Sequence, residues 1–270
     1  MPDVINIGVL GAEGRMGAAI ILALKSQPEA RLSVAITSPR SNNIGIDAGV
    51  AVGISECDVN LTADIQTGLD ICDVMIDFSS PEAAIDAALG MHETRCRSLI
   101  TGTTGYTETE EAALLAASGS ITLLKSGNFS LGVNLLEALV ETASSKLGPD
   151  WDIEILDMHH RHKVDAPSGT AIMLGQAAAK GRNVELSKTQ ILSRRGPRVA
   201  REEGQIGFAA LRGGGIIGDH EVRLASELEM ITLGHSAFDR SVFAEGAIRA
   251  AIWAASQPGG LYSMRDVLGV

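Results

Sequence analysis

The first half of the chain alternates short apolar runs with longer segments of helical periodicity. Apolar runs of the length of a buried strand occupy residues 5–10, 31–37, 74–78, 98–102 and 121–127. Two of the intervening segments carry helix-start signals: Ser80-Pro81 places a cap residue before a proline, and residues 107–110 (TETE) fit a capping box. Strands that alternate with helices predict a mostly parallel sheet with helices on both faces. The expected fold class is therefore α/β, with a doubly wound domain over residues 1–128.

The second half of the chain has a different pattern. Helical spacing of apolar residues recurs at 131–147 and 168–180, and strand patterns occur at 151–160, 206–211, 221–226 and 228–235. The last three strands follow one another without an intervening helix. Successive strands predict a second domain, of α+β type, that carries an open mixed sheet over residues 129–236.

Two further segments complete this organisation. Residues 182–203 are polar, rich in arginine and without periodicity, so we expect a long loop there. Residues 240–256 have a strongly helical apolar pattern, and we expect this helix to pack back on the first domain. The first domain would then comprise residues 1–128 plus 237–270.

Composition and charge limit the partners. The chain has 270 residues, of which 45% are hydrophobic, and a formal net charge of −11. It can bury a substantial core, and its negative field repels nucleic acid and anionic membranes. Its apolar stretches are too short to span a bilayer, and its N-terminus lacks a signal-peptide pattern. We expect a cytoplasmic protein with neither a nucleic-acid nor a membrane partner.

A glycine turn follows the first predicted strand. In GAEGRMG, Gly11, Gly14 and Gly17 recur at every third position, and Glu13 stands where GxGxxG has its middle glycine. Gly11 permits a tight exit from the strand, Gly14 lets the backbone approach a pyrophosphate, and Gly17 lets the helix lie close to the sheet. Free amides and the helix dipole favour a phosphate there. The turn predicts dinucleotide binding; a purely structural turn is the alternative.

The end of the second predicted strand bears on which dinucleotide is bound. An NAD-binding fold usually has an acidic residue there for the adenosine ribose, but this chain has Thr37-Ser38-Pro39-Arg40. Hydroxyls with Arg40 nearby, and Arg15 from the glycine turn, would suit a 2′-phosphate. We therefore expect NADPH, or use of both NADPH and NADH. A polar surface turn without cofactor contacts is the alternative.

Two more polar segments follow strands of the parallel sheet. GTTG (residues 102–105) and SGNFS (residues 126–130) each lie at the carboxyl end of a predicted strand, where such folds bind ligands. Each could be a simple turn. Together, beside a glycine-turn cofactor site, they predict contacts with the nicotinamide or the substrate.

The stretch HHRHKVDAPSGT, residues 159–170, concentrates positive charge directly after a predicted strand. Histidines adjacent on one loop rarely converge on one ion, no cysteine is near, and Arg161 and Lys163 would repel a cation, so we expect no metal. Cys57, Cys72 and Cys96 form no CxxC pair, which argues against a disulfide framework or a structural zinc site. A solvated basic loop is the other structural alternative.

We interpret this stretch as an anion site with acid–base ability. Lys163 offers a fixed charge, and a histidine can hold or release a proton near neutral pH. Ser168, Gly169 and Thr170 then begin a helix whose free amides can bind a carboxylate. An ordinary helix cap explains the last three residues alone, but their place after the histidines and the lysine predicts one anion cradle.

Four motifs carry a resemblance to a known family. GAEGRMG, GTTGY, SGNFSLGVN and HHRHKVDAPSGTA, in this order and spacing, closely resemble the 4-hydroxy-tetrahydrodipicolinate reductases of the diaminopimelate route to lysine. The likeness extends from the glycine turn to the C-terminal MRDVL. It implies a Rossmann-type domain that binds NADH or NADPH, and a second domain that binds a cyclic dicarboxylate and assembles a homotetramer through its open sheet.

The resemblance also implies residue roles. The proton donor would be His159, with Lys163 as its partner in proton delivery. The substrate carboxylates would be held by His160, Lys163, Ser168, Gly169 and Thr170. The cofactor would be lined by Gly11, Ala12, Glu13, Gly14, Arg15, Met16, Gly102, Thr103, Thr104, Ser126, Gly127, Asn128 and Phe129. Family members often carry an acidic residue where this chain has Thr37, which argues against a preference for NADH.

The resemblance leaves two alternatives and adds one expectation about motion. A different dehydrogenase of the same architecture, of the aspartate or homoserine type, would lack the histidine stretch. In a non-catalytic NADPH sensor, that stretch would be expected to be eroded. Because cofactor and substrate would lie on different domains, we expect closure around both ligands, with hinges near residues 127–130 and Ser236.

Overall fold

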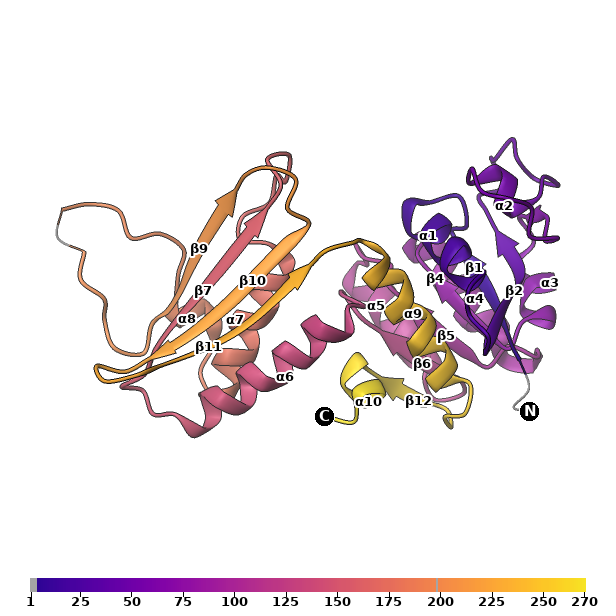
Figure 1. The fold of residues 1–270 in the computed structure, drawn as a ribbon. Helices are drawn as coiled ribbons and strands as arrows, with labels where there is room; N and C mark the ends of the chain where they lie inside the picture. Colours follow the sequence, from indigo (N-terminus) through magenta and orange to yellow (C-terminus); the bar gives the residue numbers. More distant parts are fainter. Residues whose placement is uncertain (1–3, 198) are drawn as a thin grey trace. The chain divides into compact units, whose positions relative to one another are not determined.

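The computed structural model describes residues 4–197 and 199–270, and it divides the chain into two compact units (Figure 1). Residues 1–3, within the first expected domain, and Arg198, within the expected loop, lie outside the described residues. Unit 1 comprises the chain up to Ser130 together with Ser241–Gly269, and unit 2 comprises Leu131–Arg240 with Val270. The boundaries between the units, after Ser130 and after Arg240, fall a few residues beyond the expected domain limits of 128 and 236.

Unit 1 is built on a seven-stranded sheet in which all neighbouring strands are parallel. In spatial order the strands are β12 (Gly260–Tyr262), β6 (Thr122–Lys125), β5 (Ser98–Thr101), β4 (Val74–Asp77), β1 (Ile5–Leu10), β2 (Ala30–Ile36) and β3 (Leu61–Thr62). β4 is buried along its whole length. This burial agrees with the unbroken apolar run in its sequence, and the prediction of a doubly wound α/β fold is confirmed.

Two rows of helices cover this sheet. The elements are α1 (Arg15–Leu24), α2 (Ala48–Ala51), α3 (Ile65–Ile71), α4 (Pro81–Gly90), η1 (Met91–Glu93), α5 (Glu108–Ala117), α9 (Ser241–Ala254) and α10 (Met264–Leu268). α1 packs beside α9, and α4 packs between α3 and α5. Ser80 caps α4 with Pro81 at its first position, and Thr107 and Glu110 form the capping box of α5, so both predicted helix starts are confirmed.

Unit 2 has a five-stranded mixed sheet, which confirms the prediction of a second α+β fold. Its strands in spatial order are β11 (Met230–Ala237), β10 (Gly218–Ala225), β7 (Asp152–His159), β9 (Ile206–Arg212) and β8 (Gln190–Ile191). β10 runs antiparallel to both β7 and β11, whereas β9 is parallel to β7 and β8. Helices α6 (Leu131–Lys146) and α7 (Gly169–Gly181) pack together, and their apolar residues join those of the sheet in one core.

The expectation of a loop throughout residues 182–203 is wrong in part. Helix α8 (Leu186–Thr189) and β8 lie within it, and β8 adds an edge strand to β9. Both elements are short, and the main apolar side chain of α8, Leu186, packs against the unit 2 core from outside it. None of the helices in the described part of the chain has the length and hydrophobicity needed to cross a bilayer.

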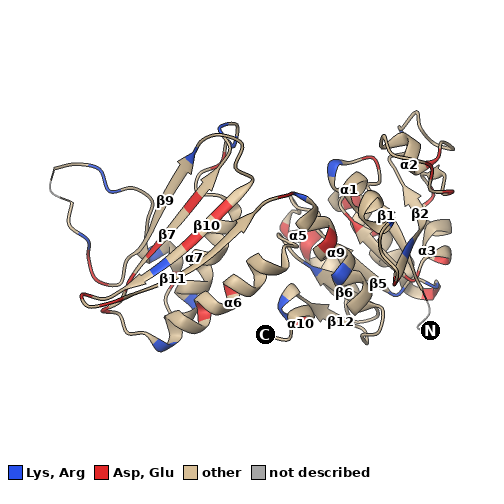
Figure 2. Ribbon diagram, in the orientation of Figure 1, with Lys and Arg blue, Asp and Glu red and all other residues tan. Residues whose placement is uncertain are grey.

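Charged residues are interspersed over both units (Figure 2). Acidic and basic positions occur on the helices, the strands and the loops of each unit. With a net charge of −11, the positive potential needed to hold any anionic ligand has to come from a local cluster of side chains.

Candidate functional site

Unit 1 contains a cleft of about 1080 Å³ at the carboxyl ends of β1, β2 and β4. Ligands of open α/β sheets bind at this edge. Of the residues predicted to contact the cofactor, those that line the cleft are Gly11, Glu13, Gly14, Thr37, Ser38 and Arg40. The predicted residues outside its lining are Ala12, Arg15, Met16, Gly102, Thr103, Thr104, Ser126, Gly127, Asn128 and Phe129.

The glycine turn has the tight geometry that was predicted from its spacing. Gly11 has φ +84°, and a Cβ on it would stand 2.4 Å from the carbonyl oxygen of Phe78. A Cβ on Gly17 would stand 2.3 Å from the carbonyl oxygen of Gly11, so only glycine lets α1 approach the turn this closely. Gly14 is the N-cap of α1 and makes no side-chain cap. The first amides of α1 are therefore suited to a phosphate, and this part of the chain fits a dinucleotide.

The end of β2 differs from the sequence-based picture. Residues 37–46, directly after β2, include no carboxylate, but the fold brings the Glu13 side chain there from the glycine turn. The Thr37 hydroxyl donates to Glu13 Oε2, and Asn43 Nδ2 donates to Glu13 Oε1 at 2.5 Å. Hydrogen bonds from the Ser41 and Thr37 side chains lower the pKa of Glu13 from its usual value. The end of β2 thus carries a negative charge, contrary to the premise of our NADPH expectation.

The two remaining unit 1 motifs meet around Phe78, which lines the cleft. A Cβ on Gly102 would stand 2.1 Å from the Phe78 ring, so the GTTG segment lies directly against it. The rings of Phe78 and Phe129 pack edge to face with centroids 5.4 Å apart. The Ser79 amide donates to Thr103 Oγ1 at 2.9 Å. The fold therefore brings both motifs to one side of the cleft.

Sequence reasoning missed the residue that orders these loops, Asp77. Its side chain is fully buried at the end of β4, and burial raises its pKa. It accepts hydrogen bonds from the hydroxyls of Ser79 and Thr101, and Thr101 in turn accepts from the Thr103 amide. The signal was the polar DFSS segment directly after an apolar strand. Asp77 therefore ties the segment after β4 and the end of β5 to the carboxyl end of β4.

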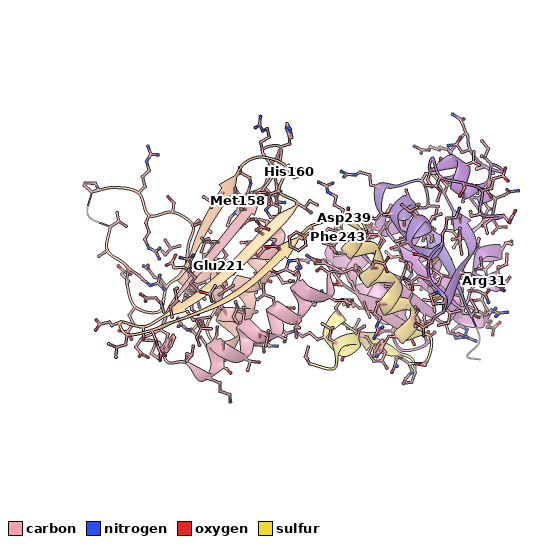
Figure 3. The ribbon with its side chains drawn as sticks, viewed as in Figure 1. Arg31, Met158, His160, Glu221, Asp239 and Phe243 are labelled. Carbon is pink, nitrogen blue, oxygen red and sulfur yellow. The ribbon has the colours of Figure 1, made fainter. Side chains whose placement is uncertain are left out.

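The candidate site of unit 2 begins at the carboxyl end of β7. Buried and partly buried residues alternate along this strand, so Asp157 and His159 lie on the same inward face. Asp157 Oδ1 lies 2.5 Å from His159 Nδ1, a close contact without the geometry of a linear hydrogen bond. Met158 and His160, which flank His159, are labelled in Figure 3.

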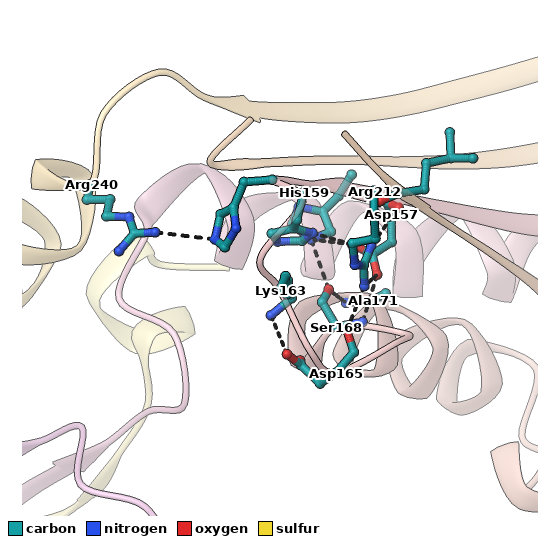
Figure 4. A network of polar contacts seen from close by, with 11 residues as sticks. Asp157, His159, Lys163, Asp165, Ser168, Ala171, Arg212 and Arg240 are labelled. Carbon is teal, nitrogen blue, oxygen red and sulfur yellow. Dashed lines mark hydrogen bonds and ion pairs between the residues drawn. The ribbon is translucent and has the colours of Figure 1, made fainter. Parts of the chain in front are cut away.

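The start of helix α7 is hydrogen-bonded to the carboxylate of Asp157 (Figure 4). The Ser168 amide donates to Asp157 Oδ2 at 2.7 Å, and Ser168 Oγ accepts from the Ala171 amide at 3.1 Å as the N-cap. The same hydroxyl lies 3.2 Å from His220 Nε2. His220 comes from β10, where it pairs in register with Asp157. Asp157 thus joins β7, β10 and the start of α7.

Two cations border this cluster. Arg212, at the end of β9, lies 3.3 Å from Asp157 Oδ2 and donates to the Asp165 carbonyl oxygen at 2.6 Å. Lys163 Nζ lies 2.9 Å from Asp165 Oδ1. The predicted Lys163 charge is therefore paired with the exposed carboxylate of Asp165 in the loop before α7.

The other predicted residues surround this loop. His160 Nε2 lies 3.4 Å from Arg240, and its ring centroid lies 6.2 Å from that of His162. Gly169 is exposed at the first position of α7, and a Cβ there would meet nothing within 4 Å. Its missing side chain leaves room for a ligand at the helix start, next to Thr170.

Burial and charge shift the protonation of this cluster. Burial would raise the pKa of Asp157, but the hydrogen bond from the Ser168 amide and the positive charge of Arg212 oppose it, and the pKa is lowered. Burial lowers the pKa of His159, against the opposing effect of Asp157. Burial, with His159 nearby, lowers the pKa of His220 to about 4. At neutral pH the cluster therefore holds a charged Asp157 and two neutral histidines.

The cluster also brings together side chains that could ligate a metal ion. Ligand atoms of Asp157, His159 and His220, all buried, lie within 4.8 Å of one another. This set differs from the adjacent histidines weighed in the sequence, and His160 and His162 do not belong to it. The guanidinium of Arg212 already lies against Asp157, and a cation beside it would be repelled. The arrangement favours proton transfer over metal binding.

Comparison with known proteins agrees with this description. Residues 5–129 match the family profile described as dihydrodipicolinate reductase, N-terminus, and residues 132–268 match the corresponding C-terminus. A 4-hydroxy-tetrahydrodipicolinate reductase of Methylocella silvestris is 48% identical over 262 residues, with 97% of this chain and 96% of that protein covered. One from Brucella abortus is 49% identical over 263 residues, with 97% and 98% covered.

Solved structures show the same fold. A dipicolinate-bound dihydrodipicolinate reductase from Paenisporosarcina sp. TG-14 superimposes with a TM-score of 0.78 at 21% identity, covering 97% of this chain and 98% of that one. An amine dehydrogenase from Mycobacterium smegmatis gives a TM-score of 0.58 at 14% identity, covering 97% and 95%. With both family profiles matched and close relatives aligned over nearly the whole length, the chain belongs to the dihydrodipicolinate reductase family.

Proposed function

We propose that the chain reduces 4-hydroxy-tetrahydrodipicolinate to tetrahydrodipicolinate, with the 4-hydroxyl group leaving as water, the cofactor bound by unit 1 and the substrate by unit 2. Membership of the family makes the chain an NAD(P)H-dependent oxidoreductase of the diaminopimelate route to lysine. The observation that carries the division of roles is the cluster in which one carboxylate, Asp157, contacts both His159 and the start of α7.

The cofactor, NADH or NADPH, supplies a hydride when bound. Its pyrophosphate would lie on the amides at the start of α1, which Gly11 and Gly14 leave accessible. The cleft beyond the turn, lined by Ser38 and Phe78, would take the rest of the dinucleotide. The loops that Asp77 ties together would flank the nicotinamide.

The substrate carboxylates would be held in unit 2 by charge and by free amides. Lys163 would exchange its exposed partner, Asp165, for a substrate carboxylate, a replacement that needs only a side-chain movement. The amides of Gly169 and Thr170 at the start of α7 would bind the same group or the second one, and His160 would border it. The rest of the chain is acidic and repels a dianion, so binding depends on this local cluster of positive charge and free amides.

His159 would deliver the proton that balances the hydride. Its Nδ1 faces Asp157, so Nε2 is the atom left to donate. Arrival of a dianion beside His159 and Lys163 raises the pKa of the imidazole, which burial lowers in the free protein. Substrate binding would therefore charge the proton donor, and Asp157 would act as a positioning residue that stabilises the imidazolium.

Reaction requires both ligands to meet, so we propose that the units close around them. The chain passes between the units at residues 130–131 and 240–241, close to the hinges expected near residues 127–130 and Ser236. Small-angle X-ray scattering with NADH and dipicolinate added together should show compaction, and an unchanged radius of gyration would contradict closure.

A homotetramer is proposed in addition, through the open sheet of unit 2. β11 is an edge strand of that sheet, and Met230 and Ile231 on it are exposed. Sedimentation equilibrium should give four times the chain mass of 28.2 kDa. A mass of one chain at micromolar concentration would contradict it.

The activity is tested directly by a coupled assay. Substrate is generated from pyruvate and aspartate semialdehyde by the upstream synthase, and oxidation of the reduced nicotinamide is followed by its absorbance. Oxidation that requires both the synthase and this chain is the expected result. Oxidation that is equally fast without the synthase would point to another dehydrogenase substrate, and no oxidation would point to a non-catalytic protein.

A further inference from the structure

The residue that departs from the usual glycine pattern, Glu13, occupies a defined place in the fold. The amides of Gly11 and Ala12 both donate to the Ile36 carbonyl oxygen, at 2.9 and 3.0 Å, and so fasten the turn to the end of β2. The Glu13 side chain then reaches the residues after β2, where it accepts from Thr37 and from Asn43. The carboxylate is thus fixed from two sides at the strand end.

This carboxylate is available to a ligand. Glu13 is only partly buried, and it lines the unit 1 cleft beside Ser38 and Arg40. A carboxylate has about four lone-pair positions, so the hydrogen bonds from Ser41, Thr37 and Asn43 leave capacity for a further one. Rossmann-type folds place a carboxylate at the end of the second strand to accept the hydroxyls of the adenosine ribose. Here that carboxylate arrives from the glycine turn.

We propose that Glu13 accepts the adenosine ribose hydroxyls and selects NADH over NADPH. This inference rests on the dinucleotide site proposed above for unit 1. A 2′-phosphate would replace one hydroxyl donor by a dianion next to a fixed carboxylate, and it would leave Glu13 without that donor. The preference is therefore the reverse of the one expected from Thr37-Ser38-Pro39-Arg40 alone.

The cation in the cleft lining does not remove the penalty. Arg40 also lines the cleft, and it is the residue that would attract a 2′-phosphate. Its side chain is exposed to solvent, so its interaction with a phosphate is screened. Glu13 is held by Thr37 and Asn43 and cannot turn away without losing both bonds. Repulsion from Glu13 therefore outweighs attraction by Arg40.

Calorimetric titration of the full-length protein with NADH and with NADPH tests the proposal without turnover. The wild-type protein is expected to bind NADH at least about tenfold more tightly than NADPH. Glu13→Gln keeps the shape and removes the charge, so it should weaken NADH binding and strengthen NADPH binding. The affinity ratio should fall by about tenfold or more.

A positioning variant and a matched control complete the test. Thr37→Val removes one bond to the carboxylate and should lower the NADH to NADPH ratio by a smaller factor, about threefold. Glu29→Gln removes an exposed carboxylate just before the opposite end of β2 and should leave the ratio unchanged. The thermal midpoints of all variants are recorded, because a purely structural role of Glu13 would change stability and leave the ratio unchanged.

The outcomes are distinct. A wild-type preference for NADPH, or a ratio that is the same in the wild type and in Glu13→Gln, overturns the role of Glu13 while the dinucleotide site stands. Failure of the wild-type protein to bind either nucleotide overturns the dinucleotide site, and the role of Glu13 with it. A reduced ratio in Glu13→Gln with the control unchanged supports the proposal, even if Thr37→Val fails to fold.

Discussion

The candidate sites of the two units differ in whether backbone or side-chain groups form them. The cleft of unit 1 is shaped by backbone: glycines with no room for a Cβ and amides at the start of α1. The cluster of unit 2 is shaped by side chains from separate strands, joined through Asp157. A backbone site tolerates changes of side chain but no added bulk, whereas a side-chain site depends on single functional groups. This difference predicts which substitutions damage each unit.

The largest effect is expected where one functional group carries the chemistry. His159→Ala or Lys163→Ala should lower kcat by about two orders of magnitude or more, because His159 is the proposed proton donor and Lys163 the charge proposed to face the reacting dianion. Steady-state kinetics with the coupled assay measure this effect. His92→Ala, an exposed histidine of unit 1, is the matched control. Turnover close to wild type in either site variant would remove the role assigned to that residue.

The unit 1 cleft should be damaged by substitutions that add a side chain at its glycines. Gly11→Ala places a Cβ against the Phe78 carbonyl oxygen and also strains a residue at φ +84°. We expect a loss of unfolding free energy of about 2 kcal/mol or more, together with loss of NADH binding. Denaturant titration and calorimetry measure the two quantities. Gly105→Ala has a similar φ, +87°, but open space around the Cβ, so it separates strain from the clash. Equal effects in both variants would show that the clash contributes nothing.

The buried histidine of unit 2 should make stability depend on pH. Because the folded pKa of His220 is about 4 and the unfolded value is near 6.5, the unfolded state binds more protons between these values. Stability should therefore fall as the pH is lowered through this window, by about 2 kcal/mol between pH 7 and pH 5. Urea denaturation at both pH values tests this, with His220→Gln as the variant that should lose that share of the dependence.

The smallest effect is expected at the shared carboxylate. Asp157→Asn keeps the size of the side chain and removes its charge beside His159. We expect kcat to fall by about tenfold, and the pKa that governs kcat on the alkaline side to move lower, because the imidazolium loses its partner. A purely structural role would lower stability without moving the pH profile. His235→Asn, another partly buried histidine position of unit 2, serves as the control for nonspecific effects on the sheet.

Much of the fold could be predicted because its signals are local. Five strands of unit 1 (β1, β2, β4, β5 and β6), the caps of α4 and α5 and the succession of strands in unit 2 are each encoded in a few neighbouring residues. β3 and β12, of two and three residues, are too short to show periodicity, and they were not predicted. The same holds for α8 and β8 within the polar segment that was expected to be a loop.

The candidate sites were predictable only where their residues are contiguous in sequence. The stretch from His159 to Thr170 is recognisable in the sequence as a candidate site. Arg212 and His220 are not, because they join it only through the pairing of β9 and β10 with β7. Register between distant strands is not encoded in a local pattern. Likewise, the residues directly after β2 include no carboxylate. The folded chain nevertheless has one at that position, because Glu13 reaches it from the preceding turn.

Asp157 gives unit 2 one further property. A single acid bonds the first turn of α7 with one oxygen and touches the imidazole of His159 with the other. An anion bound at that turn would change the electrostatic field that also sets the pKa of the imidazole. Ligand binding and proton uptake would therefore be coupled through this one carboxylate, without a conformational change to connect them.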